Sequence, residues 1–404
     1  MSDLINNVPA LRFSGYTLPW VKNKLGSFGV LVSGLTYSPD NIVEDGLLVL
    51  RSSNVQNSQI ALTDNVYVDI DVAENNLTRK DDILICIRNG SKRLIGKNTL
   101  IPESLPKATH GAFMAVFRGA NNKFIYQWMQ TEKYFKQVHK NLGATINSIN
   151  GSDLKKFPII ASDNLEEQQK IADFLSSVDK KIEQLTEKHR LLTEYKKGVM
   201  QQIFTQQIRF KDDSGNDYPE WEEKKLGQFG SIVGGGTPET SKSSYWEGDI
   251  QWFTPTEIKQ KYMSKSIRTI SEEGLKKSSA KLLPVGALLL TTRATIADLS
   301  IATQECSTNQ GFQSIIVNDQ NDNEFLYYWI LNNRKQFIRK ASGSTFPEIS
   351  KKEIEKMEGV FPQKEEQQKI ANFLTEIDQK IDQAWSTLEQ TKAFKKGLLQ
   401  KMFV

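Results

Sequence analysis

Cysteine and histidine are scarce in this sequence of 404 residues, which holds 2 of the first and 3 of the second. Cys86 and Cys306 lie in separate apolar runs, with no CxxC spacing and no histidine nearby. His189 lacks the surrounding set of cysteine, histidine or carboxylate ligands that a zinc site requires. The sequence therefore predicts reduced core cysteines, as in a cytoplasmic protein, and no metal site.

Long apolar runs are also missing, and no segment approaches the roughly 18 apolar residues of a membrane helix. The first residues, MSDLINNVPALRF, lack the basic and apolar regions of a signal peptide. Charged residues make up 25% and hydrophobic residues 38% of the chain, which is typical of a globular protein in water. The length allows two or more domains, each with its own core.

The sequence strings of common DNA enzymes are absent as well. There is no P-loop GxxxxGK(S/T), and no Asn/Asp-Pro-Pro-aromatic tetrapeptide accompanied by a glycine-rich cofactor loop. Asp40 follows a proline and precedes Glu44, but no lysine follows at the spacing of a Pro-Asp…Glu-x-Lys nuclease. The histidines show no pairing with a nucleophile. A self-contained DNA-modifying enzyme is therefore kept only as an alternative to a non-catalytic function.

The dominant feature is a stretch that occurs twice, at residues 166–204 and 365–403, without a gap. The copies begin EEQQKIADFL and EEQQKIANFL, and their apolar residues alternate in steps of three and four. This spacing predicts two coiled-coil helices, each about 58 Å long at about 1.5 Å per residue. The predicted seam consists of Ile171, Leu175, Val178, Ile182, Leu185 and Leu192 in the first copy, and Ile370, Leu374, Ile377, Ile381 and Leu388 in the second.

Polar residues interrupt this seam at equivalent places, because Lys196 and Lys395 both occupy apolar-stripe positions. A polar group in a seam usually specifies the register of the helices at some cost in stability. Each helix copy carries equal numbers of acidic and basic residues, whereas residues 1–165 hold 18 Lys and Arg against 14 Asp and Glu. The net charge of +4 therefore belongs to the first domain.

The repeat extends beyond the helices, because residues 11–29 and 208–230 both end in Lys-Leu-Gly-x-Phe-Gly. Farther on, THGAFMAVF (109–117) parallels NQGFQSIIV (309–317). Aromatic residues recur at helical spacing in the sequences FIYQW and FLYYW, which indicates core packing more than base stacking.

We expect an α+β chain of two pseudo-two-fold-related globular domains separated by two long antiparallel helices. In that arrangement the N-terminal segment lies near the C-terminal helix. The predicted boundaries are 1–162 and 208–361 for the domains, with 163–207 and 362–404 for the helices.

These motifs resemble the specificity subunit of type I restriction-modification systems. The resemblance is carried by the two EEQQKIA helix starts, the Lys-Lys-Gly near each helix end, the Pro-Glu-Trp before the second domain, GGGTP (234–238) and TNQGF (308–312). The first half departs from the pattern, with Ser-Gly-Leu-Thr (33–36) and THGAF (109–113) at the corresponding places.

The resemblance implies a non-catalytic subunit of a DNA adenine methyltransferase and type I endonuclease complex. Each target recognition domain would bind one half of a bipartite, asymmetric site in double-stranded DNA. The helices would set the spacing and dock two methyltransferase subunits, and through them the restriction and translocase subunits. S-adenosylmethionine, ATP and magnesium would belong to those partners, and no membrane is involved. A purely structural coiled-coil scaffold would leave the two globular domains without a role.

Candidate DNA contacts come from loops that follow strand-like runs. Arginine can bind guanine or phosphate, asparagine can read adenine, and lysine mostly binds phosphate. In the first domain the candidates are Arg51, Asn54, Arg88, Asn89, Lys92, Arg93 and Lys97. In the second they are Gly235, Thr237, Ser241, Lys242, Tyr245, Thr254, Thr256, Lys259, Arg293 and Thr295. The glycine triplet 234–236 would allow the backbone to approach a phosphate closely.

The missing catalytic strings lead to a direct prediction. The purified chain alone should transfer no methyl groups to DNA, cleave no DNA and hydrolyse no ATP. Radiolabelled methyl transfer, plasmid nicking and phosphate release would measure these activities. Methyl transfer by the pure chain without a partner would contradict the interpretation.

Overall fold

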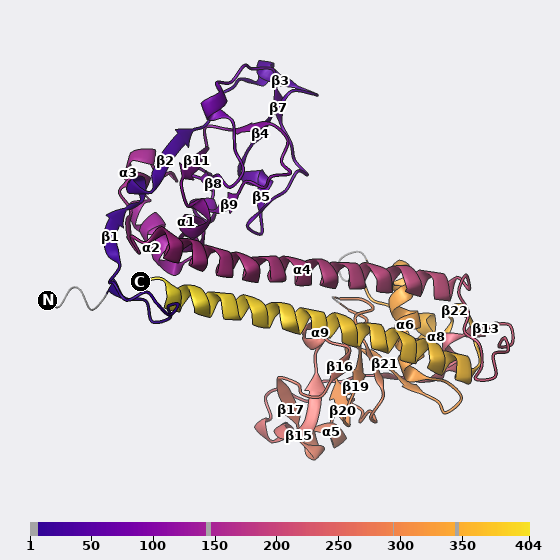
Figure 1. Cartoon of the computed structure of the whole chain (residues 1–404). Helices are drawn as coiled ribbons and strands as arrows, with labels where there is room; N and C mark the ends of the chain where they lie inside the picture. The colour runs from indigo at the N-terminus through magenta and orange to yellow at the C-terminus, as the bar shows by residue number, and fades with distance from the viewer. Residues whose placement is uncertain (1–6, 143–146, 294, 344–346) are drawn as a thin grey trace. The chain divides into compact units, whose positions relative to one another are not determined.

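A computed structural model describes residues 7–142, 147–293, 295–343 and 347–404. The chain divides into two compact units, residues 1–187 with 385–404 (unit 1) and residues 188–384 (unit 2). Two long helices, α4 (Leu165–Phe204) and α9 (Lys364–Met402), each contribute one part to each unit (Figure 1). Each unit therefore contains a globular segment and parts of both long helices. The boundaries predicted from the sequence instead place the domains and the helices in separate segments.

Unit 1 is built from two small sheets, a hairpin and short helices (Figure 1). One sheet has the antiparallel order β2 (Gly29–Ser33), β11 (Met114–Gly119), β8 (Ile83–Cys86) and β9 (Asn98–Leu100). The other has the order β10 (Ala108–His110), β4 (Leu47–Leu50), β7 (Tyr67–Val68) and β3 (Ile42–Val43). Strands β1 (Val21–Lys24) and β12 (Pro158–Ala161) pair antiparallel, while β5 (Val55–Gln56) and β6 (Gln59–Ile60) form the hairpin. The helices are α1 (Asn122–Met129), α2 (Glu132–Asn141) and α3 (Gly151–Lys155).

Unit 2 repeats this plan. Its larger sheet has the order β14 (Gly230–Gly234), β21 (Gln313–Val317), β18 (Leu288–Leu290), β19 (Leu299–Ala302) and β16 (Tyr262–Met263). The smaller has the order β17 (Arg268–Ile270), β15 (Trp246–Phe253) and β20 (Cys306–Thr308), and β13 (Glu222–Lys225) pairs with β22 (Glu358–Phe361). The helices are α5 (Glu272–Lys276), α6 (Asn323–Asn332), α7 (Arg334–Lys340) and α8 (Lys351–Glu355). The predicted α+β class is confirmed.

The short apolar strands and aromatic helices form the cores. All four residues of β8 are buried, as expected for a strand covered on both faces. Both aromatic motifs are buried as predicted, including Trp128 in α1 and Trp329 in α6. Asn121 caps α1 by accepting a hydrogen bond from the Phe124 N–H, and Asp322 does the same for Phe325 in α6.

The two cysteines and the most buried histidine are inert core groups. Cys86 and Cys306 are free thiols and fully buried. Burial raises the pKa of Cys86 to about 11 and that of Cys306 to about 12, so both stay protonated at neutral pH. Burial also lowers the pKa of His110, which keeps its imidazole neutral.

Strand register corrects one pairing inferred from the sequence repeat. The sequence comparison set His110 against Gln310, but His110 pairs with Leu50 while Thr308 pairs with Phe253. The next hydrogen bonds agree, because the Gly111 N–H donates to Leu50 O and the Asn309 N–H to Phe253 O, both at 3.0 Å. A two-residue shift keeps each side chain on the same face of its strand, so only the strand pairing decides this register.

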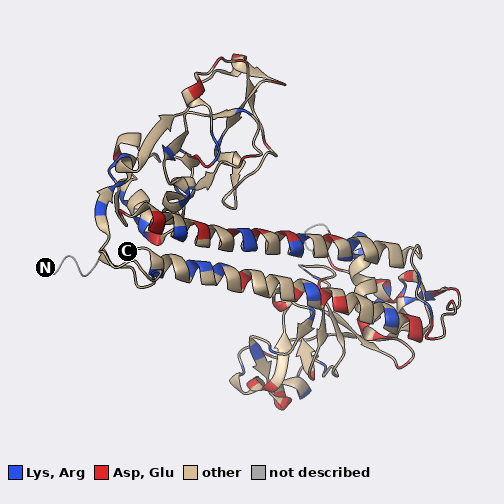
Figure 2. Cartoon of the chain, in the orientation of Figure 1, with Lys and Arg blue, Asp and Glu red and all other residues tan. Residues whose placement is uncertain are grey.

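In each unit the beginning of one long helix packs against the end of the other, so the two are antiparallel. The core of unit 1 contains Ile171 and Leu175 of α4 together with Leu398 and Met402 of α9. The core of unit 2 contains Ile370 and Leu374 of α9 together with the end of α4. All predicted seam residues are buried or half-buried. Both long helices carry acidic and basic residues along their length (Figure 2).

The seam lysines are held by aspartates of the opposite helix. Lys395 Nζ lies 2.5 Å from Asp179 Oδ1 in unit 1, and Lys196 Nζ lies 2.5 Å from Asp378 Oδ1 in unit 2. The second carboxylate oxygen accepts a bond from the globular domain, from Gln127 Nε2 at 2.7 Å and, in unit 2, from the Tyr328 hydroxyl at 2.6 Å. Each aspartate therefore ties both helices to the domain beside them.

A buried glutamate at the start of each helix holds the segment that leads into the domain. Glu167 is fully buried and accepts two bonds from Arg12, with Nε–Oε1 at 2.6 Å and Nη2–Oε2 at 2.9 Å. Glu366 is equally buried and binds Arg209 Nη2 at 2.9 Å and Trp221 Nε1 at 3.0 Å. These contacts explain why a glutamate occupies the second position of the EEQQ motif at both helix starts.

The same lead segments also contact the opposite helix end. The Leu11 N–H donates to Lys401 O at 2.9 Å, which confirms that the N-terminal segment lies near the C-terminal helix. In unit 2 the Ile208 N–H donates to Gln202 O at 3.2 Å, just after α4 ends. The same contact between a lead segment and a helix end therefore occurs in both units. In unit 2 the two partners follow each other in the chain, whereas in unit 1 they are far apart in the sequence.

Removing the buried carboxylate should destabilise unit 1. Glu167→Ala leaves the Arg12 guanidinium without its partner, and the free energy of unfolding should fall by about 3 to 5 kcal/mol. Urea denaturation would measure the loss. Glu103→Ala, which removes only an exposed ion pair with Lys80, is the matched control and should leave the midpoint unchanged.

The same pair predicts a pH dependence. Burial alone raises the pKa of Glu167, but hydrogen bonds from Arg12 and Ser162 outweigh it, so the pKa lies below its ordinary value. A lowered pKa in the folded state means that this stabilisation is present above the unfolded carboxyl's pKa and is lost as the pH falls through the folded one. A difference between wild type and Glu167→Ala that persists unchanged in acid would contradict the assignment.

Candidate nucleic-acid interface

Four loops of unit 1 meet at the ends of its strands and are joined by hydrogen bonds. We call them loop cluster 1, which comprises residues 34–36, 51–54, 87–93 and 110–113. The Leu35 N–H donates to His110 O at 2.7 Å, and the Ala112 N–H returns a bond to Leu35 O at 2.9 Å. Asn89 Nδ2 donates to Ser52 Oγ at 2.9 Å. The sequence-distant loops thus form one connected surface.

Loop cluster 1 presents unpaired cations. Arg88, Lys92 and Arg93 are exposed, and among the described residues none of the three forms an ion pair. The sequence from 83 to 102 contains no acidic residue. Lys92 and Arg93 begin a short 3-10 helix, Lys92–Leu94, at the end of the segment 87–93. Free basic side chains on loops of this kind are suited to phosphate and guanine contacts.

Unit 2 places corresponding loops together on the same framework. We call them loop cluster 2, which comprises residues 235–238, 254–257, 291–293 and 308–311. The Gly236 N–H donates to Thr308 O and the Thr292 N–H to Gly311 O, both at 2.8 Å. The hydroxyl of Thr237 bonds the side chain of Gln310. The GGGTP and TNQGF motifs are therefore adjacent in space although 70 residues apart in sequence.

Comparison with known proteins identifies this framework. A family model described as "Type I restriction modification DNA specificity domain" matches residues 18–193 and again residues 218–390. The chain belongs to this family. Its two matches follow the internal duplication, and the family is one of DNA specificity rather than catalysis. We therefore describe the chain as a type I specificity subunit with two target recognition domains.

Named relatives agree. The chain is 38% identical over 185 residues to the type I restriction enzyme MjaIX specificity subunit of Methanocaldococcus jannaschii, a match that spans 44% of this chain and 43% of that protein. It is 28% identical over 398 residues to the putative MjaX specificity subunit of the same organism, covering 92% and 89%. The crystal structure of an S subunit from M. genitalium has the same fold, with a TM-score of 0.66, 16% identity and coverage of 98% and 99%.

Several candidates in the first recognition domain are occupied inside the protein. Asn54 is fully buried, and its amide bonds Ala61 O and Asp64 O while Oδ1 accepts the Arg51 N–H, so it cannot read adenine. Lys97 donates to Val55 O, a contact that the sequence cannot show. Arg51 pairs with Asp64 at 2.8 Å. These three side chains have partners within the protein; Asn54 is fully buried, and the DNA contacts predicted for Arg51 and Lys97 stay predictions.

Gly235 and Gly236 of the second recognition domain pack closely against the protein's own chain. A Cβ at Gly235 would lie 2.0 Å from Asn309 O, and one at Gly236 would lie 2.3 Å from Ala280 N. The close approach that these glycines permit is therefore an approach to the protein's own chain. Tyr245 is also buried, beneath Lys242, and packs in the core of the small sheet.

The remaining side chains of the second domain are mostly hydroxyls and paired charges. Arg293 binds Glu348 at 2.9 Å, while Lys242 and the hydroxyl of Ser241 both bind Glu239. Thr254 donates to Glu257, and Thr295 lies in the same loop as Arg293, between β18 and β19. Thr256 and Lys259 are exposed. Loop cluster 2 is thus less basic than loop cluster 1.

Sequence reasoning missed Phe113, an exposed aromatic in loop cluster 1. The guanidinium carbon of Arg88 lies 5.6 Å from the centroid of its ring. The THGAF departure from the TNQGF pattern was the available signal. It also missed Gln310, whose contact with Thr237 becomes visible only in the folded loops.

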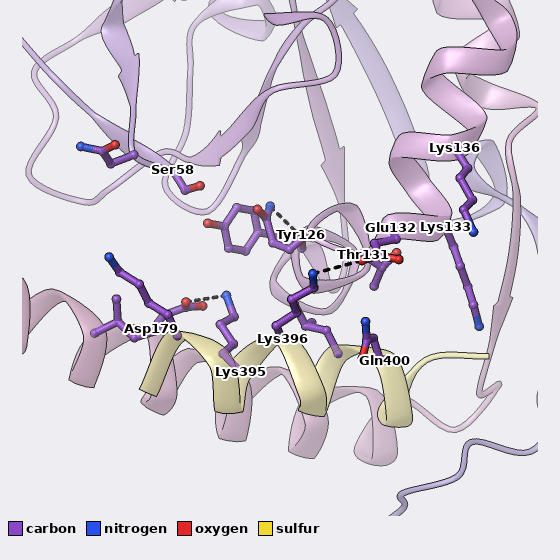
Figure 3. A pocket seen from close by; sticks show the side chains of 15 residues that line it. Ser58, Tyr126, Thr131, Glu132, Lys133, Lys136, Asp179, Lys395, Lys396 and Gln400 are labelled. Atoms are coloured by element: carbon purple, nitrogen blue, oxygen red, sulfur yellow. Dashed lines mark hydrogen bonds and ion pairs between the residues drawn. The ribbon is translucent and has the colours of Figure 1, made fainter. Parts of the chain in front are cut away.

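A cavity of about 500 Å³ in unit 1, between α1, α2 and the end of α9, is lined by five lysines (Figure 3). Four of them already have partners. Lys395 pairs with Asp179 and Lys396 with Glu132, as Figure 3 shows, while Lys392 pairs with Glu389 and Lys133 donates to Phe403 O. These contacts join the recognition domain to the helices, and they pair three of the five lysines with carboxylates.

The contrast between exposed and internal lysines can be tested. Lys92→Gln should weaken binding to every duplex and reduce the salt dependence of log K by about 0.9 for one lost phosphate contact. Lys97→Gln, which removes a bond to the protein's own backbone, should lower thermal stability and leave the salt slope unchanged. Fluorescence anisotropy at several salt concentrations would measure both. Equal slopes for wild type and Lys92→Gln would exclude a phosphate contact.

Proposed function

We propose that this specificity subunit reads a bipartite, asymmetric DNA site, with one half-site bound by each recognition domain. The observation that supports this most directly is the shared loop framework with different exposed side chains. The Gly111 N–H donates to Leu50 O at the end of β4, and the Asn309 N–H makes the equivalent bond to Phe253 O at the end of β15. Around them, loop cluster 1 presents Arg88, Lys92 and Arg93, whereas loop cluster 2 presents hydroxyls.

The difference matters because base readout depends on the donors and acceptors that a loop presents, not on the scaffold below. Two equivalent scaffolds with unlike side chains suit two unlike half-sites, so the complete site need not be palindromic. The free cations of loop cluster 1 would also supply much of the sequence-independent attraction to phosphate.

We also propose that the helices dock two methyltransferase subunits, and through them the restriction and translocase subunits. The exposed aromatics Tyr195 of α4 and Phe394 of α9 support this, since they are 54% and 57% exposed and occupy equivalent positions of the helix repeat. Equivalent apolar sites on both helices suit two copies of one partner. S-adenosylmethionine, ATP and magnesium would bind those partners, in the cytoplasm. No described helix is long and apolar enough to cross a membrane.

Exchanging a single recognition domain tests the bipartite proposal. The exchange should run from Leu25 to Phe157, because β1 and β12 close the domain there and the Arg12–Glu167 pair stays intact. The expected result is a new first half-site beside an unchanged second one, detected by methylation-sensitive sequencing of host DNA. The matched exchange from Leu226 to Met357 should alter only the other half. Simultaneous change of both halves in either chimera would rule out one half-site per domain.

A further inference from the structure

Phe113 is exposed but held in a fixed position. Its side chain is 55% exposed, whereas the next residue, Met114, is fully buried at the start of β11. The carbonyl of Phe113 accepts hydrogen bonds from the Ile87 N–H at 3.0 Å and the Arg88 N–H at 3.1 Å. The preceding Ala112 N–H is bonded to Leu35 O. The backbone of this aromatic is thus attached to two other loops of loop cluster 1.

The ring also has a cationic neighbour that lacks an acidic partner. Arg88 lies over the ring, is exposed itself, and forms no ion pair with any described residue. Single exposed apolar side chains are ordinary on protein surfaces. An aromatic whose backbone is bonded to two other loops, with Arg88 over its ring and with Lys92 and Arg93 in the same loop cluster, is a less ordinary combination. Apolar ring and free cations together match a nucleobase next to its phosphate.

The second recognition domain cannot have the same feature. Thr292 donates to Gly311 O as Arg88 donates to Phe113 O, which places Gly311 at the position of Phe113. A Cβ at Gly311 would lie 2.7 Å from Pro255 Cγ, so a side chain there would collide with the neighbouring loop. The aromatic therefore belongs to one recognition domain alone.

We propose that Phe113 makes an apolar contact with a nucleobase in the half-site read by the first recognition domain, and that Arg88 orients the ring and binds the adjoining DNA. This rests on the proposed function. Two kinds of base contact share this chemistry. The ring can pack against the methyl group of a thymine in the major groove, or it can insert against a base step and partly unstack it.

Affinity measurements on the assembled methyltransferase complex test the contact. Phe113→Ala should weaken binding to a duplex with the complete site by about tenfold and leave binding to a non-specific duplex unchanged. Phe113→Leu should recover part of the loss because it keeps an apolar side chain. Leu18→Ala, which truncates another exposed apolar residue of the same unit, is the matched control and should bind like wild type.

Substituted duplexes distinguish the two kinds of contact and locate it. If the ring packs on a thymine methyl, replacing that thymine by uracil should weaken wild type and have no further effect on Phe113→Ala. If the ring inserts, 2-aminopurine at the affected step should brighten with wild type and not with Phe113→Ala. Either signal should occur in one half-site only.

Two results would overturn the inference. Site-specific affinity of Phe113→Ala equal to that of wild type would show that the ring makes no base contact. Loss of methyltransferase assembly with unchanged DNA affinity would make Phe113 a protein contact instead. Both outcomes differ from failure of the proposed function, in which wild type itself would show no preference for the complete site over a non-specific duplex.

Discussion

The buried carboxylates of Glu167 and Glu366 are the interaction on which both units depend. Each lies at the start of a long helix and binds the arginine of the segment that leads into a recognition domain. A charge in such a place is tolerated only with a partner and further hydrogen bonds. Once the pair forms, the lead segment, the helix start and the strand that opens the domain are held together.

A second polar contact, at Asp179 and Asp378, extends that anchor along the helices. Each aspartate binds a lysine of the opposite helix and a side chain of the neighbouring domain. Two apolar helices can slide by a turn without much loss of burial, whereas a paired charge in the seam selects one register. The two equivalent ion pairs thus fix the position of each domain along an otherwise uniform apolar stripe. A subunit that reads DNA at fixed positions needs domains that are held in this way.

On this shared framework the two domains differ in the chemistry that they expose. The first combines unpaired cations with Phe113, while the second combines glycine-dependent loop packing with hydroxyls and paired charges. Backbone bonds at equivalent positions keep both loop clusters in place, so side chains on the surface can change without altering the scaffold. The duplication therefore supplies two equal supports for two unequal recognition surfaces.

The sequence by itself determined the duplication, the two long helices, their buried seam and the α+β class. These depend on periodicity and on repeated motifs, which are properties of neighbouring residues in the chain. The tertiary structure alone decided which polar side chains are free. Asn54 and Lys97 look as available as Lys92 in the sequence, yet the first two bond backbone carbonyls elsewhere in the fold. The register that sets His110 against Thr308, and the exposure of Phe113, likewise depend on strands and loops far apart in the chain.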